Sequence, residues 1–209
     1  MPKTKKTAGN DSEGSSKSTR TRARILEAAA IVLKERGYAA SRLSDIADVA
    51  EVQAPALYYY FSSREELIEE VVTIGQKRVF DHVTETLAAH PDLEPIDRIR
   101  LAVRAQLEVT LRDSAHASAA IRTSSHLPPD IRERQLVEQR RYGDLWRGLI
   151  ADAAEAGQVN NKLDMGSARL FALGALNWVP EWWNPELGSL DDVIANAQTF
   201  VLDGLRTRG

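Results

Sequence analysis

Three consecutive tyrosines, Tyr58, Tyr59 and Tyr60, are the residues of this sequence whose type and spacing best suit a chemical task. A phenolic hydroxyl can donate a hydrogen bond to a phosphate oxygen, and the ring can pack on a sugar or a thymine methyl group. A short helix that displays such rings instead of burying them is suited to binding DNA. The alternative, for Tyr60 first, is that one ring packs inside a small domain.

The tyrosines are flanked by other side chains suited to the same contacts. Gln53 can read adenine or cap a helix, and Ala56 can meet a thymine methyl group. Arg64 can bind a phosphate or remain a surface charge. The predicted DNA-contacting residues are Arg42, Ser44, Gln53, Ala54, Ala56, Tyr58, Tyr59, Tyr60 and Arg64.

Two short helices around a tight turn are expected to position these residues. The first presents an apolar face at helical spacing, made of Leu43, Ile46, Ala47 and either Val49 or Ala50. Residues 51–52 form the corner before the second helix. In that helix Leu57 and Phe61 face inward, which leaves Tyr58 and Tyr59 outward. This is the pattern of a helix-turn-helix, whose second helix enters the major groove of DNA.

The stretch APALYYYFSSREEL resembles the end of the DNA-binding domain of the tetracycline-repressor (TetR) family. The preceding RARILEAAAIVLKERGYAASRLSDIADVA resembles that family's first two helices, so the match covers about residues 20–67. The resemblance implies a homodimer that binds a double-stranded DNA operator and responds to a small-molecule effector. Two positions depart from the family pattern. Glu51 replaces a turn glycine, and Arg42 replaces a helix cap, a role that Ser41 or Ser44 is expected to take.

The remainder of the chain predicts further helices and no strand. A first helix is expected over about 20–36, ended by Gly37, and a long helix from about Ser63 to Ala88 joins the head to the body. The other helices are predicted at about 95–113, 115–123, 130–156, 164–183 and 189–205.

The fold class is therefore all-α, with an N-terminal three-helix helix-turn-helix head and a C-terminal helical body for ligand binding and dimerisation. The expected divisions are a disordered basic arm at residues 1–18, the DNA-binding domain at 19–65 and the body at 66–209.

Charge is distributed unevenly along the 209 residues, whose formal net charge is −3. Residues 1–64 hold eleven Lys/Arg against seven Asp/Glu, and residues 65–209 hold sixteen against twenty-three. The resulting net charges of +4 and −7 indicate that only the N-terminal part meets a polyanion. The lysines of the arm can follow a phosphate backbone, or the arm can be a solvated tail.

An effector pocket is expected inside the body, between the long joining helix and the helices predicted at about 95–113, 130–156 and 164–183. Its polar candidates are Arg104, Gln106, Arg122, His126, Tyr142 and Asn177, with Trp146 and Trp178 as apolar walls. Arg122 and His126 could instead lie on the surface. The string ALNWVPEWWNPELGSLDDV resembles regulators of lipid, steroid or CoA-thioester catabolism in the same family. A lipid-like or CoA-linked effector is favoured, and a flat aromatic ligand is the alternative.

The resemblance also implies that the last two helices form a four-helix bundle with those of a second copy. The candidates for that interface are Ala168, Ala172, Ala175, Trp182, Ala197 and Val201. The cluster of Trp178, Trp182 and Trp183 could instead pack in the core.

Other classes of function find little support in the sequence. The chain has no cysteine, and its four histidines lack partners at metal-ligand spacing, so neither a metal nor a cofactor is expected. Neither a glycine-rich phosphate loop nor a nucleophilic serine motif is present, so we expect no catalytic residue. No apolar run is long enough to span a bilayer, and the N-terminus lacks the apolar region of a secretory signal. A cytoplasmic protein is therefore expected.

Together these features predict a ligand-responsive DNA-binding transcriptional regulator. Repression, relieved by a small apolar or CoA-linked effector, is the favoured mode. The alternatives are a helical small-molecule carrier and a protein-binding adaptor, each with a head domain that is only structural. Sequence-specific DNA binding would exclude the carrier, and dimerisation of the pure chain would argue against the adaptor.

Overall fold

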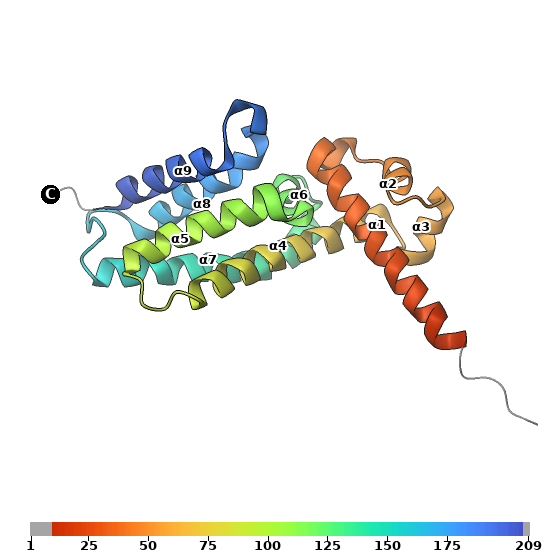
Figure 1. The fold of residues 1–209 in the computed structure, drawn as a ribbon, viewed down its shortest axis with the longest axis horizontal. Helices are drawn as coiled ribbons and strands as arrows, with labels where there is room; N and C mark the ends of the chain where they lie inside the picture. Colours follow the sequence, from red (N-terminus) through yellow and green to blue (C-terminus); the bar gives the residue numbers. More distant parts are fainter. Residues whose placement is uncertain (1–9, 207–209) are drawn as a thin grey trace, which may run out of the picture.

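The computed structural model describes residues 10–206, which fold into helices joined by short loops (Figure 1). The α-helices of this part are α1 (Asn10–Ala40), α2 (Leu43–Val49), α3 (Ala54–Tyr60), α4 (Arg64–Ala88), α5 (Pro95–Glu108), α6 (Ala115–Ser124), α7 (Pro129–Glu155), α8 (Met165–Trp182) and α9 (Leu190–Leu205). A π-helical turn at Val109–Asp113 and a 3-10 turn at Pro185–Leu187 complete the order. The predicted all-α fold is confirmed.

The helices form a small head and a larger body, joined by α4 (Figure 1). α1, α2 and α3 form the head at one end, and α4 runs from there into the body beside α5 and α7, with α8 and α9 beyond. α6 lies at the junction and packs against both α1 and α4. The predicted long helix between head and body is therefore present.

The head core extends beyond the helices of the head itself. The predicted apolar stripe of α1, made of Ile25, Leu26, Ala29, Val32 and Leu33, is buried. The same cluster also takes in Leu67, Ile68, Val71 and Val72 of α4, Ala119 and Ala120 of α6, and Ile131 of α7. The expected division at residue 65 thus runs through a continuous apolar core.

α1 differs from the predicted helix at its N-terminal end. It begins at Asn10, so residues 10–18 are helical where the sequence predicts a disordered arm, and residues 1–9 lie outside the described residues. Extending an existing helix costs far less than starting one, so polar residues can continue it. The other end agrees with the prediction, because Gly37 leaves helical geometry with φ 71° and a last turn reaches Ala40.

Two local features position α4: the cap at its start and its close crossing with α6. Ser63 caps its start, as predicted, since its hydroxyl accepts a hydrogen bond from the Glu66 amide at 3.1 Å. Farther along, a Cβ atom at Gly75 would lie 2.1 Å from the backbone oxygen of His116 and 2.7 Å from Cβ of Ala120. Only a residue without a side chain allows α4 and α6 to approach this closely.

The body helices follow the predicted ranges with one difference. α5 ends at Glu108 and gives way to the π-helical turn, where the sequence predicts one helix to residue 113. Gly157, with φ 71°, follows the end of α7, and Ser189 caps α9 by accepting from the Asp192 amide at 3.1 Å, both as predicted. Within residues 10–206, no helix has the length and apolar character needed to cross a membrane.

Candidate DNA-binding surface and ligand cavity

α3 presents two tyrosine rings to solvent on an apolar base. Leu57 and Phe61 are 1% and 3% exposed, so the predicted inward pair does pack in the head core. Tyr58 and Tyr59 are 62% and 80% exposed. Aromatic rings left in water on a short, firmly packed helix are suited to a partner surface. The assignment of that partner as DNA stays a prediction at this point.

Tyr60 packs between the exposed tyrosine Tyr59 and the head core. It is half-buried against the head core, and its ring meets that of Tyr59 edge-to-face, with 5.1 Å between the centroids. This agrees with the alternative in which one ring packs inside the head. Gln53 and Ala54 are exposed, and Ala56 is half-buried. Gln53 is the N-cap residue of α3, but its side chain makes no capping hydrogen bond, so the side-chain amide remains available for a contact.

The start of α2 is organised differently from the expected arrangement. Arg42 is its N-cap residue, and no side chain caps the helix. Capping by Ser41 or Ser44 is therefore wrong: Ser41 is buried and its hydroxyl donates to the Gly37 carbonyl at 2.6 Å, while Ser44 points into solvent. Arg42 and Ser44 are both exposed beside α3 and stay candidates for DNA contacts.

Glu51 forms the corner between α2 and α3 in a glycine-like conformation. Its φ is 52°, in the left-handed region that costs a residue with a side chain roughly 1–2 kcal/mol. The amide of Glu51 donates to the Asp48 carbonyl at 3.1 Å, and that of Val52 donates to Ala47 at 3.0 Å. These turn bonds hold the corner, although the residue usual there in the resembling family is absent.

Arg64 is a brace inside the head, and its role as a phosphate-binding residue stays a prediction. Its Nε donates to the Ser41 carbonyl at 3.0 Å, and its Nη2 donates to the Tyr38 carbonyl. The guanidinium also lies 4.6 Å from the centre of the Tyr38 ring. These contacts engage Nε and Nη2 at the α1–α2 junction, and Nη1 lies 3.6 Å from a carboxylate oxygen of Glu65.

Arg22, which the sequence analysis did not single out, braces the opposite side of α3. Its guanidinium pairs with the Glu70 carboxylate through two hydrogen bonds and lies 4.8 Å from the centre of the Phe61 ring. The pair ties α1 to α4 over the end of α3. The sequence offers no local sign of it, since 48 positions separate the two residues.

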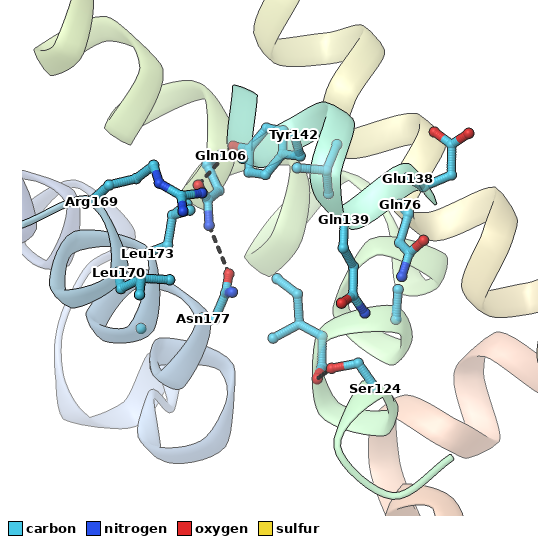
Figure 2. Close-up of a pocket in the computed structure, with 15 residues that line it drawn as sticks. Gln76, Gln106, Ser124, Glu138, Gln139, Tyr142, Arg169, Leu170, Leu173 and Asn177 are labelled. Carbon is cyan, nitrogen blue, oxygen red and sulfur yellow. Dashed lines mark hydrogen bonds between the residues drawn. The ribbon is translucent and has the colours of Figure 1, made fainter. Parts of the chain in front are cut away.

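The body contains a cavity of about 430 Å³ between α4, α5, α6, α7 and α8 (Figure 2). Three of the predicted residues, Gln106, Tyr142 and Asn177, line it. The Tyr142 hydroxyl donates to Oε1 of Gln106 at 2.7 Å, and Nε2 of Gln106 donates to Oδ1 of Asn177 at 3.0 Å. Burial raises the pKa of Tyr142 above its usual range, so this hydroxyl keeps its proton and remains a donor.

The other predicted pocket residues lie elsewhere. Arg104 faces away from the cavity, where it pairs with Glu108 at 3.0 Å and Asp191 at 3.1 Å. Trp146 is fully buried in the body core, so it packs against the helices rather than walling the cavity. Arg122, His126 and Trp178 line a second hollow at the junction of head and body, which adjoins the cavity and shares Asn177 with it. Trp178 and His126 are exposed there.

Most of the cavity lining was not predicted by the sequence analysis, and three of the missed residues bear on its chemistry: Gln76, Gly143 and Arg169. Gly143 is buried in α7, and a Cβ atom there would lie 2.5 Å from Nη1 of Arg169 on α8. The Gln76 side-chain oxygen is buried without a hydrogen-bond partner among the described residues. A glycine within the polar stretch RRYGDLW was the one available signal, because glycine inside a long helix is unfavourable without a packing reason.

α6 connects the cavity to the head. Ala120 and Ser124 of α6 line the cavity, and the opposite side of the helix meets α1. The Arg122 guanidinium donates to the Lys34 carbonyl of α1 and lies 3.3 Å from the carboxylate of Glu181 on α8. Side chains of α6 therefore touch both the head and the cavity-lining helix α8.

His116 makes a second connection from α6. Arg78 of α4 donates to its Nδ1 at 3.1 Å, and a carboxylate oxygen of Glu27 in α1 lies 3.3 Å from the same nitrogen. Burial, followed by the charge of Arg78, lowers the pKa of His116, while Glu27 acts in the opposite direction. The imidazole is therefore held neutral at the junction of α1, α4 and α6.

α8 and α9 expose a broad apolar face. Its large side chains are Leu170, Phe171, Trp178, Trp182 and Phe200, each more than half exposed. Of the predicted interface residues, Trp182 belongs to this face, and Ala175 and Ala197 line a hollow of about 480 Å³ beside it. Ala172 packs in the body core instead, and Ala168 is half-buried against that core. Val201 is 4% exposed and belongs to the core, although it also borders the hollow.

Residues 10–206 show no cluster of three or more His, Asp or Glu side chains arranged to hold a metal ion. The arrangement is thus one of an exposed aromatic helix, a cavity and an apolar face, connected by packed helices. Such an arrangement suits binding.

Comparison with known proteins finds similarity along most of the chain. A model of the C-terminal domain of tetracyclin repressor-like proteins matches residues 92–205, and one of the bacterial regulatory proteins of the tetR family matches residues 25–71. The HTH-type transcriptional repressor KstR2 of Rhodococcus jostii (strain RHA1) is 30% identical over 189 residues, which cover 88% of this chain and 90% of the relative.

Solved structures share the same fold. The ketosteroid transcriptional regulator KstR2 of Mycobacterium tuberculosis has a TM-score of 0.74 at 22% identity and covers 90% of this chain and 95% of its own. AibR in complex with isovaleryl coenzyme A and operator DNA has a TM-score of 0.75 at 20% identity and covers 86% of this chain and 97% of its own.

Proposed function

The chain belongs to the TetR family of bacterial regulators, and from that premise we propose that α3 binds an operator, α8 and α9 hold a homodimer, and the body cavity receives the effector. The protein is a ligand-responsive DNA-binding transcriptional regulator. Repression is supported by the 30% identical relative, whose name is that of a repressor. The named relatives are regulators of transcription, and we infer no enzymatic role.

The observation that carries the DNA assignment is the exposure of Tyr58 and Tyr59 above the buried pair Leu57 and Phe61. The apolar pair fixes the direction in which the rings point, so they can meet a DNA backbone without local refolding. Exposed Gln53, Arg42 and Ser44 lie on the neighbouring turns and add polar contacts, and Ala54, Ala56 and Tyr60 complete or support the surface. Arg64 also braces the head, and its phosphate contact stays a prediction.

The homodimer is assigned to the apolar face of α8 and α9. Rings as exposed as Phe171 and Phe200 are unusual on a monomer, and covering them with a second copy lowers the free energy. Two heads held by such a dimer would read half-sites about 34–36 Å apart, one turn of DNA. An operator read in this way is approximately palindromic, and a regulator bound to it works in the cytoplasm.

The effector is proposed to act through α6 as well as α4. The contacts favour a path from the cavity wall at Ala120 and Ser124 to the junction at Arg122 and His116. A ligand that displaces α6 would change how α1 is held. Such coupling is commonly worth about 1–3 kcal/mol, enough to change operator affinity by five- to 150-fold.

The test is binding of the full-length protein to the DNA upstream of its own gene, with competitor DNA and a series of salt concentrations. We expect a footprint with two-fold symmetry and affinity that falls steeply with salt, because phosphate contacts release counterions. Tyr59→Ala should weaken operator binding by about 1–3 kcal/mol for each lost contact. Leu93→Ala, in the loop after α4 and far from the head, is the matched control and should bind as the wild type does.

Two results would overturn the proposal. Wild-type affinity in the Tyr59→Ala protein would remove α3 from the DNA interface. A folded dimer that binds no DNA site at low salt would favour the alternatives, a small-molecule carrier or a protein-binding adaptor.

A further inference from the structure

We propose that the cavity recognises an amphiphilic effector through an anionic oxygen group, a carboxylate or a phosphate, which Arg169 binds while the apolar part packs on Val79, Ile121 and Leu173. The inference rests on the proposed function, since it assigns the effector class of the same cavity. It goes further by naming the residue that selects the ligand and the chemistry that it selects.

The first support is the notch that α7 provides for Arg169. Gly143 is buried within a 27-residue helix, where glycine is unfavourable because it loses more backbone freedom than any other residue. Any Cβ atom at this position would come within 2.5 Å of Nη1 of Arg169. The missing side chain is therefore what allows the guanidinium to lie against α7 at the cavity wall.

The second support is that the guanidinium has no partner. Within the described part of the chain, none of the donors of Arg169 makes a hydrogen bond or ion pair, although the residue is half-buried. The one acid of the cavity wall, Glu138, lies across the cavity from Arg169 (Figure 2) and 3.8 Å from Arg141. A half-buried guanidinium left free at a cavity is poised for a carboxylate or phosphate, which matches its planar pair of donors.

The remaining lining matches a ligand with an apolar part and some polar atoms. The side-chain oxygen of Gln76 is buried without a partner, so it can accept a hydrogen bond from a ligand N–H or O–H. In contrast, Gln106 is already occupied at both ends by Tyr142 and Asn177 and serves to fix the wall. The cavity volume of about 430 Å³ lies within the usual range for small-molecule sites, about 300–1,000 Å³.

The test compares ligands that differ only in the anionic group. Octanoate and 1-octanol have the same eight-carbon chain, but only octanoate is charged. Octanoyl-CoA and free CoA both carry phosphates, but only octanoyl-CoA has the eight-carbon chain. Binding of each to the full-length protein is measured by isothermal titration calorimetry at fixed ionic strength. We expect octanoate or octanoyl-CoA to bind at least tenfold more tightly than 1-octanol, and free CoA to bind weakly.

The variants locate that preference in the cavity. Arg169→Met keeps the length of the side chain without its charge and should reduce the preference about tenfold, whereas Arg147→Met, on the exposed side of α7, should retain it. Gly143→Ala should reduce the preference in the same way by expelling the guanidinium from the notch. Its matched control is Gly148→Ala, five residues along the same helix, where a Cβ atom meets nothing within 4 Å.

A preference carried by octanoate alone identifies a free carboxylate as the source, and one carried by octanoyl-CoA alone identifies the phosphates. Equal binding of octanoate and 1-octanol, binding of none of the four compounds, or a preference that survives Arg169→Met would overturn the inference. Operator binding is measured on the same preparations. If it persists, only the effector class is wrong; if it is lost in the wild type, the proposed function itself fails.

Discussion

Replacing Gly75 by alanine would place a methyl group between α4 and α6, the two helices that carry the junction of head and body. The added Cβ atom would lie 2.1 Å from the His116 backbone oxygen and 2.7 Å from Cβ of Ala120. Neither atom can swing aside, since one belongs to the backbone and the other is attached directly to it. The helices would have to separate along their crossing.

The size of the effect follows from two opposed contributions. Alanine is favoured over glycine within a helix by about 1 kcal/mol. Overpacking a core typically costs 1–3 kcal/mol and occasionally more, and two contacts this short place Gly75→Ala at or above the upper end. We therefore expect a net loss of about 2 kcal/mol or more, which for a chain of this length lowers the Tm by roughly 4–8 °C.

Urea denaturation of the full-length protein, followed by circular dichroism, measures this loss. All variants are compared at one protein concentration, because the apparent stability of a dimer depends on concentration. Gly148→Ala is the control, because its Cβ atom meets nothing within 4 Å and it should gain up to about 1 kcal/mol from helix propensity. If Gly75→Ala proved as stable as the wild type while Gly148→Ala gained stability, the close crossing of α4 and α6 would be refuted.

Three further predictions concern the head and the junction. Glu51→Gly should be more stable than Glu51→Ala by about 1 kcal/mol in urea denaturation, because only glycine relieves the φ of 52°; equal stabilities would contradict a left-handed corner. Arg64→Met should lose about 1–3 kcal/mol by leaving two carbonyl groups without a donor, whereas Arg42→Met should change stability by less than about 0.5 kcal/mol; equal effects would argue against the brace. Burial and Arg78 lower the pKa of His116 from 6.5, so below about pH 6.5 the unfolded chain binds a proton at this residue that the native chain does not bind. The free energy of unfolding is therefore unaffected by protonation of His116 above about pH 6.5 and falls as the pH drops towards the native pKa. His116→Gln should flatten the stability profile between pH 7.5 and 5.5, and His90→Gln, at the exposed end of α4, should not; an unchanged slope in His116→Gln would refute a neutral buried imidazole.

The recognition helix could be predicted because its determinants are local. Leu57 and Phe61 lie one helical turn apart, and that spacing alone fixes which side of α3 is buried and hence which tyrosines are exposed. The caps at Ser63 and Ser189 are similarly short-range, since each accepts a hydrogen bond from an amide three residues later. Where the partner is a few residues away, residue type and spacing are sufficient.

The roles of the arginines could not be predicted in this way. Arg64 meets carbonyl groups of Tyr38 and Ser41, and Arg169 meets Gly143, so each environment is made by a segment 23 or more positions distant. A guanidinium is equally suited to a phosphate, a carboxylate or a backbone carbonyl, and residue type alone does not distinguish them. Only the packing of α1, α7 and α8 decides between these roles.

Two neighbouring residues of α5 show why the cavity lining could be predicted only in part. Arg104 and Gln106 lie two residues apart on α5, and residues at that spacing point to different sides of a helix. Gln106 faces the cavity, whereas Arg104 faces α9 and pairs with Asp191. The sequence located the correct helix, but the rotation of α5 about its axis depends on neighbours that periodicity does not identify.

The shared core of the head limits how this regulator can be recombined with others. Ala119, Ala120 and Ile131 of the body complete the apolar packing around α1 and α4. A chimaera joined near residue 65 would place an unrelated surface against α1, leaving apolar groups poorly covered and the attitude of the head undefined. Engineering a new operator specificity on this body is therefore better done by exchanging exposed residues of α3 than by transplanting a whole head, and a grafted head would need matching changes on α6.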